Sequence, residues 1–82
     1  MEKVPQVLIN VKVKVKKPLI DIQNIQIAIK AAEEKLGGTG RVLVRYSGTE
    51  PIVRVMIEGI DQDLIDTLAM SISEEIRREI GD

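Results

Sequence analysis

The segment spanning residues 45–54 carries side chains whose types and spacing suit the binding of an anion. Arg45 and Arg54 flank the loop Ser47-Gly48-Thr49-Glu50-Pro51, between two stretches rich in valine and isoleucine. Two guanidiniums, two hydroxyls and a glycine N–H at one hairpin tip could hold a phosphate. Because glycine has no Cβ, the backbone at Gly48 allows a ligand to approach closely. The candidate phosphate ligands are Arg45, Ser47, Gly48, Thr49 and Arg54.

The hairpin register decides whether the two arginines meet. If the hairpin closes symmetrically about the middle of the loop, Arg45 faces Arg54, as directly opposed residues do in an antiparallel pair. The same register sets Leu43 opposite Met56 and Arg41 opposite Glu58. A slip of one residue would instead send the two arginines to opposite faces. Ser-Gly-Thr before a proline is also ordinary turn chemistry, and arginines at strand ends are often only solvated.

Other charged or glycine-rich segments favour structural roles. Gly37-Gly38-Thr39-Gly40 matches the GxxG pattern of some RNA-binding domains, but it stands between a predicted helix and a strand, where a helix C-cap fits. The lysines at 12, 14, 16 and 17 lack interleaved aromatic residues that could stack on bases, so they predict a solvated sheet edge or face and no nucleic-acid partner. The acidic pairs and triplets at 33–34, 74–75 and 61–66 predict solvent-facing helix surfaces rather than a metal site.

Alternation of apolar and polar residues predicts three strands. From residue 7 to 16 every second residue is Val or Ile, while the intervening positions include Asn10 and three lysines. This pattern indicates a strand with one buried face and one mostly wet, basic face. The segments 41–46 and 52–58 are predicted as two further strands.

Two helices follow from apolar positions three and four residues apart. The first is expected from about residue 22 to 36, capped by Asp21, and the second over about 62–80, capped by Asp61. The order strand, helix, strand, strand, helix predicts an α+β two-layer domain. Its sheet of three or four mostly antiparallel strands would carry both helices on one face, and residues 1–82 would form a single domain.

Composition excludes several classes of chemistry. The 82 residues contain no cysteine and no histidine, which rules out disulfides, thiolate metal sites and the usual general base near neutral pH. No acid and base pair up in a plausible pocket, so we expect no catalytic residue in this chain. Residues 1–54 carry ten Lys/Arg against five Asp/Glu, whereas residues 55–82 carry two against eight, so only the first part favours an anion. The apolar runs are too short for a bilayer and no signal sequence opens the chain, so a cytoplasmic location without membrane partners is expected.

The run from Arg41 to Gly59 resembles the C-terminal phosphate-binding loop of the α-D-phosphohexomutase superfamily. Its pattern, GRVLVR-x-SGTEP-x-VRVM-x-EG, is most similar to the phosphoglucosamine mutase branch. Pro5-Gln6-Val7-Leu8-Ile9-Asn10-Val11 is similar to the entry into the fourth domain of that branch. The resemblance covers nearly the whole chain, and it implies a fold like that of the TATA-binding protein.

The resemblance also implies a function. Members of this superfamily move a phosphoryl group between two positions of a hexose, using a phosphoserine, a Mg²⁺ loop and a sugar-reading loop in three other domains. The fourth domain grips the phosphate that is not transferred, which assigns that role to the five candidate ligands. The chain lacks Ser-His-Asn-Pro, Asp-Gly-Asp and Gly-Glu-x-Ser-Gly segments. We therefore expect no cofactor in this domain and no catalysis by the 82 residues alone.

The expected function is accordingly that of the C-terminal phosphate-binding domain of a larger mutase that interconverts glucosamine 6-phosphate and glucosamine 1-phosphate. Its partners would be the sugar phosphate and three other domains. A phosphomannomutase or phosphoglucomutase domain is the alternative within the superfamily. A free-standing module that binds a phosphorylated metabolite or RNA is the alternative outside it.

Overall fold

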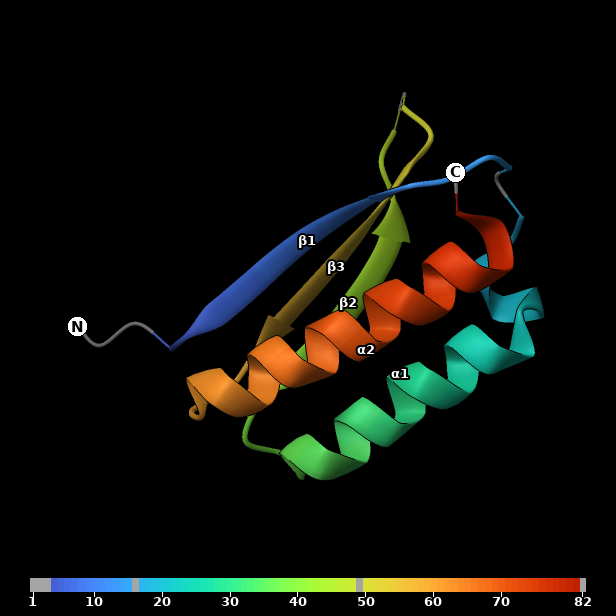
Figure 1. Cartoon of the computed structure of the whole chain (residues 1–82). Coiled ribbons are helices and arrows are strands. Elements are labelled where there is room, and N and C mark those ends of the chain that lie inside the picture. The colour runs from blue at the N-terminus through green and yellow to red at the C-terminus, as the bar shows by residue number, and fades with distance from the viewer. Residues whose placement is uncertain (1–3, 16, 49, 82) are drawn as a thin grey trace.

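The computed structural model describes residues 4–15, 17–48 and 50–81 as a sheet covered on one face by two helices (Figure 1). The helices α1 and α2 lie side by side on the same face of the sheet. The predicted α+β two-layer fold is therefore confirmed, with three strands. The elements in chain order are β1 (Gln6–Lys12), the 3₁₀ helix η1 (Leu19–Asp21), α1 (Gln23–Leu36), β2 (Arg41–Tyr46), β3 (Ile52–Glu58) and α2 (Gln62–Ile80).

The last strand of the chain, β3, lies in the middle of the sheet. It pairs antiparallel with β1 on one side and with β2 on the other, giving the order β1-β3-β2. Because side chains alternate between faces, β3 turns Val53, Val55 and Ile57 toward the helices, where all three are fully buried. Its even-numbered side chains face the side of the sheet that the helices leave uncovered, which we call the outer face.

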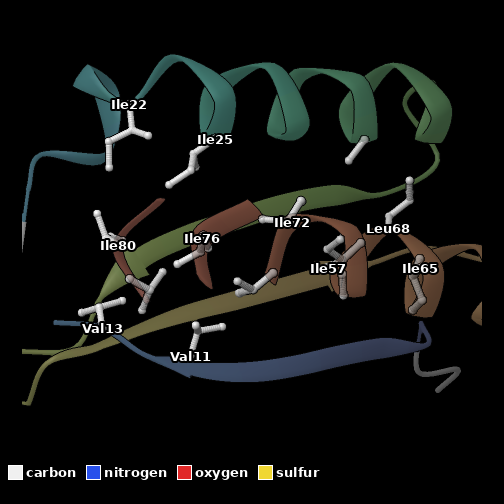
Figure 2. Close-up of a cluster of buried hydrophobic side chains, with 14 of the residues drawn as sticks. Val11, Val13, Ile22, Ile25, Ile57, Ile65, Leu68, Ile72, Ile76 and Ile80 are labelled. Carbon is white, nitrogen blue, oxygen red and sulfur yellow. The ribbon is translucent and has the colours of Figure 1, made fainter. Parts of the chain in front are cut away.

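Isoleucine and valine side chains from both layers form the core (Figure 2). The predicted apolar stripe of α2 is confirmed, because all of its residues are buried. Val11 and Val13 enter the same cluster from the β1 side. The stripe of α2 comprises Ile65, Leu68, Ala69, Ile72, Ile76 and Ile80.

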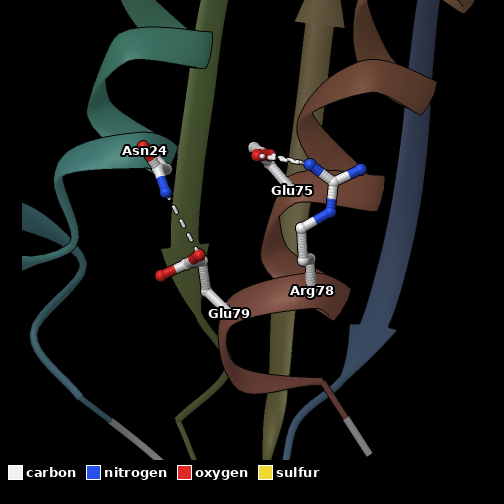
Figure 3. Close-up of polar contacts among 4 residues, drawn as sticks. All are labelled: Asn24, Glu75, Arg78 and Glu79. Atoms are coloured by element: carbon white, nitrogen blue, oxygen red, sulfur yellow. Dashed lines mark hydrogen bonds and ion pairs between the residues drawn. The ribbon is translucent and has the colours of Figure 1, made fainter.

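Polar contacts at the helix ends match part of the prediction. Asp61 caps α2, because its Oδ1 accepts a hydrogen bond from the Leu64 N–H at 3.2 Å. Near the other end of α2, Glu79 accepts from Asn24 of α1, and Arg78 forms an exposed ion pair with Glu75 at 3.3 Å (Figure 3). Such exposed contacts stabilise little, so packing of the apolar stripes holds the helices together.

The expectation that Asp21 caps α1 is wrong. Asp21 is the last residue of η1, and the N-cap of α1 is Ile22, which makes no side-chain capping bond. Ile22 is buried in the core at 7% exposure, and the amide of Gln26 donates to the Leu19 carbonyl at 2.9 Å. Burial of Ile22 thus places an apolar residue at the N-cap of α1, one position after the residue that was expected to cap the helix.

The first strand is shorter than predicted. The pairing of β1 with β3 ends at Lys12, because β3 begins at Ile52 and the preceding Pro51 has no N–H to donate. The Val13 N–H still donates to the Pro51 carbonyl, but Val13 also forms a β-bridge with Gly81, and the Lys14 N–H donates to the Ile80 carbonyl, so the chain now contacts the end of α2. Val15, expected on the buried side, is 47% exposed. The predicted strand position 16 lies outside the described residues.

Tyr46, the only aromatic residue, ties the end of β2 to the segment after β1. Its ring packs against the core and its hydroxyl donates to the Lys17 carbonyl. Burial raises the pKa of the Tyr46 hydroxyl above its ordinary value. The tie fixes the base of the β2–β3 loop, because Tyr46 stands directly before it.

The glycines of the α1–β2 turn serve the fold. Gly37 is the C-cap of α1 with φ of 56°, a left-handed conformation that favours glycine, so the predicted C-cap is confirmed. Gly40 lets the turn before β2 pass close to the end of β3, because a Cβ there would lie 1.9 Å from the Glu58 carbonyl oxygen. Nothing in this turn requires an RNA ligand.

None of the helices in the described parts of the chain is long and apolar enough to cross a membrane.

We predict that Gly40→Ala lowers the free energy of unfolding by about 1–3 kcal/mol, as overpacking does, because the added methyl group collides with backbone. Gly48→Ala is the matched control. Its Cβ would meet no protein atom within 4 Å, so the change in stability should stay within about 1 kcal/mol. Urea unfolding of the two variants gives the comparison, and equal midpoints would contradict the close approach at Gly40.

We predict that Tyr46 ionises at a higher pH in the folded chain than in the urea-unfolded chain. Because the unfolded chain then loses its proton first, the contribution of Tyr46 to stability is present below the unfolded pKa and is lost as pH rises through the folded pKa. Tyrosinate absorbance reports this one residue directly, since the chain has no other Tyr and no Trp. Identical titration curves for folded and unfolded protein would show that the ring is not packed as described.

Candidate functional site

Arg45 and Arg54 lie directly opposite each other at the base of the β2–β3 loop. The register also pairs Leu43 with Met56 and aligns Arg41 with Glu58, so the symmetric hairpin expected from the sequence is confirmed. Both guanidinium-bearing residues are exposed.

Both arginines line one open hollow on the outer face of the sheet. The hollow has a volume of about 270 Å³, and its other lining residues are Leu8, Leu43 and Met56. By the register, these three apolar residues form one row across all three strands, next to the row that holds the arginines. The arginines therefore stand at one end of a shallow apolar surface, on the face opposite the helices.

Neighbouring acids do not neutralise the arginine pair. Within the described residues the only ion pair joins Arg78 to Glu75 on α2, and no side-chain hydrogen bond involves Arg45 or Arg54. Glu58 is four residues from Arg54 along β3 and lies opposite Arg41 instead. Like charges directly opposite in a sheet destabilise by about 0.2–1 kcal/mol, and a bound dianion would turn this repulsion into attraction.

The loop begins where the ladder ends. Ser47 N–H donates to the Ile52 carbonyl at 2.8 Å, and Ile52 N–H donates to the Glu50 carbonyl at 2.7 Å, so the loop is closed tightly at its base. The loop projects beyond the sheet (Figure 1). Ser47 is half-buried and Gly48 is exposed. Thr49, the remaining predicted ligand, lies outside the described residues.

Glycine at position 48 has no explanation within the described fold. Its φ does not lie in the left-handed region, which only Gly37 and Gly38 adopt among the described residues. An added Cβ would have no protein neighbour within 4 Å. This contrasts with Gly40, where the backbone of β3 excludes a Cβ, so the space beside the Gly48 backbone is open.

The acidic clusters and the lysines of the β1 segment do not form a metal site or a continuous basic surface among the described residues. Among the residues that the structure describes, no group of three or more acids could hold a metal ion. Lys12 lies on β1, while Lys14 and Lys17 follow that strand, and all three are exposed. Because β1 is an edge strand, Lys12 stands at the predicted solvated edge of the sheet, whereas Lys14 and Lys17 lie beyond the end of the strand and Lys16 is outside the described residues.

The row of the arginines continues onto a third strand, which the sequence did not reveal. Asn10 of β1 lies directly opposite Arg54, on the side away from Arg45. The alternation within β1 places Asn10 on the polar face, but only the strand order brings it next to the hairpin. Local sequence patterns carry no signal for that order.

Comparisons with known proteins agree with this fold. A family model described as "Phosphoglucomutase/phosphomannomutase, C-terminal domain" matches residues 8–75. A phosphoglucosamine mutase from Syntrophotalea carbinolica is 49% identical over 81 residues, which are 99% of this chain and 18% of the relative. This chain thus spans under a fifth of that relative's length.

Solved structures give the same result. An N-acetylphosphoglucosamine mutase from Aspergillus fumigatus, in complex with GlcNAc-6P and magnesium, superimposes with a TM-score of 0.75 and 26% identity, over 94% of this chain and 16% of that one. An N-acetylglucosamine-phosphate mutase of the α-D-phosphohexomutase superfamily, in its substrate complex, gives a TM-score of 0.73 at 29% identity, over 89% of this chain and 15% of that one. The family match, the near-complete alignment and the shared fold together show that this chain belongs to the family of phosphoglucomutase/phosphomannomutase C-terminal domains.

Proposed function

We propose that the β2–β3 hairpin binds the phosphate group of a sugar phosphate. The observation that carries the proposal is the pair of exposed guanidiniums, Arg45 and Arg54, set side by side without a carboxylate partner among the described residues. Ser47 and Gly48 adjoin the pair along the chain and would add a hydroxyl and an unobstructed backbone N–H. Thr49 is included for its hydroxyl, next to Gly48 in the sequence, and for the family resemblance.

The chain would act as the C-terminal phosphate-binding domain, residues 1–82, of a larger phosphoglucosamine mutase. Its task would be to hold the phosphate that is not transferred while glucosamine 6-phosphate and glucosamine 1-phosphate interconvert. Binding energy gained at this remote phosphate would orient the sugar for transfer at the phosphoserine of another domain. Closure of the domain over the substrate would also exclude water from that centre.

The glucosamine assignment is supported by the relatives, since phosphoglucosamine mutases match nearly the whole chain at 46–50% identity. Such an enzyme would supply the amino-sugar precursor of UDP-N-acetylglucosamine, and we place it in the cytoplasm. The family description also names phosphoglucomutases and phosphomannomutases, so a domain of either enzyme is the alternative. In this proposal Mg²⁺ belongs to a different domain of the full-length enzyme.

We predict that inorganic phosphate raises the melting temperature of the wild-type chain, and raises that of Arg54→Ala much less. Loss of one charge-assisted phosphate contact should weaken affinity by about 1.5–3 kcal/mol, roughly tenfold to over a hundredfold. Without phosphate, Arg54→Ala should be as stable as the wild type or slightly more so, because the like-charge neighbour is gone. Differential scanning calorimetry over a phosphate series gives both quantities.

Arg41→Ala is the matched control for this experiment. Like Arg54, Arg41 is an exposed arginine of the hairpin, but it lies on β2 opposite Glu58 rather than opposite a second arginine. The variant changes the net charge equally and should keep the phosphate response of the wild type. Gly48→Ala should fold normally and bind phosphate more weakly. Equal phosphate stabilisation of the wild type and Arg54→Ala would overturn the assigned role of the pair.

We also predict that the pure 82-residue chain shows no mutase turnover in a coupled assay with glucosamine 6-phosphate. It has no histidine or cysteine, and its described part offers no metal cluster for phosphoryl transfer. A full-length relative assayed in parallel serves as the positive control. Turnover that copurifies with the chain through successive columns would contradict the assignment of this domain as a phosphate grip alone.

A further inference from the structure

On the outer face of the sheet, β1 lies next to β3, on the side of β3 away from β2. Two rows of side chains cross the sheet at this point. The first holds Asn10, Arg54 and Arg45, one from each strand. In the second, Ile52 of β3 lies between Lys12 of β1 and the start of the loop, where Ser47 N–H bonds to the Ile52 carbonyl.

We propose that β1 completes the phosphate site, with the Asn10 amide donating a hydrogen bond to the bound phosphate and the Lys12 ammonium adding a third positive charge. The assignment rests on the phosphate site proposed above and adds to it the side chains of β1, which we call the β1 wall. In this arrangement Arg54 and the half-buried Ile52 form the floor, and β1 and β2 form the two sides.

The spacing of the strands makes the contact feasible. Neighbouring strands lie about 4.8 Å apart, so Asn10 and Arg45 lie roughly 10 Å apart across β3. A phosphate centred above β3 is then within side-chain reach of residues on both flanking strands. Asn10 and Lys12 are both exposed, and no side-chain hydrogen bond in the described part of the chain involves either residue.

The residue types also favour an external anion over an internal ion pair. Arg54 has a like charge on one side and a neutral amide on the other. A carboxylate at position 10 would have neutralised Arg54 and competed with a phosphate. An asparagine leaves the charge available and supplies two N–H donors of its own.

Titration with inorganic phosphate, followed by amide chemical shifts at constant ionic strength, tests this wall. Asn10→Ala and Lys12→Gln should each weaken phosphate affinity by roughly three- to tenfold, the range expected for one hydrogen bond or one nearby charge. Gln6→Ala is the control for Asn10, because Gln6 lies on the same face of β1 but opposite Glu58. Lys30→Gln removes the same charge from the exposed surface of α1 and should change nothing. Glucosamine 6-phosphate should rank the variants in the same order, since the proposed contacts are with the phosphate.

Asn10→Asp keeps the size and shape of the side chain, so a loss of phosphate binding in this variant cannot be attributed to unfolding. It should pair with Arg54, stabilise the chain without phosphate, and weaken phosphate binding more than tenfold. If Arg54→Ala weakens binding while Asn10→Ala, Asn10→Asp and Lys12→Gln match the wild type, β1 is not part of the site and the hairpin proposal stands. If the wild type shows no saturable phosphate binding, or Arg54→Ala binds as the wild type does, the phosphate site itself is wrong and the β1 wall falls with it.

Discussion

Burial of the inner face of β3 is the constraint on which the sheet and its candidate site depend. Val53, Val55 and Ile57 are all at 0% exposure, in the middle strand and on the face that the helices cover. Burying such a side chain stabilises by about 1.5–3 kcal/mol each, whereas the repulsion between two opposed arginines costs at most about 1 kcal/mol. A slip of β3 by one residue would expose all three and bury Arg54. Burial of the core side chains therefore holds Arg54 on the outer face beside Arg45, because it outweighs the repulsion between the two charges.

The features that could be predicted from the sequence are those that a strand or helix encodes within itself. The period of two in residues 52–58 gave the face of each side chain, and the short loop gave the partner of Arg45. The apolar spacing of α2 and its Asp61 cap were likewise local, and both are confirmed. The family resemblance added the identity of the loop as a phosphate grip, a role that remains a proposal.

What could not be predicted depended on contacts between segments far apart in the chain. Asp21 has the right chemistry for a cap, but burial of Ile22 against the core sets the start of α1. The alternation around Val15 continues past the point at which β3 stops offering partners, so the strand ends while its pattern goes on. The neighbour of Arg54 on its second side depends on the strand order, and no pattern within β1 reveals that order.

The two helices cover one face of the sheet and leave the outer face free of packing demands in this chain of 82 residues. Both helices pack on one side, and the buried core lies entirely between them and the strands. Side chains on the outer face are consequently free to vary without opening a cavity, provided that the alternation is kept. The unneutralised arginines occupy positions where folding sets few demands, so their repulsion costs little stability. The same freedom holds for Asn10 and Lys12, and it makes the outer face the part of this domain where ligand chemistry, rather than packing, can select the residue.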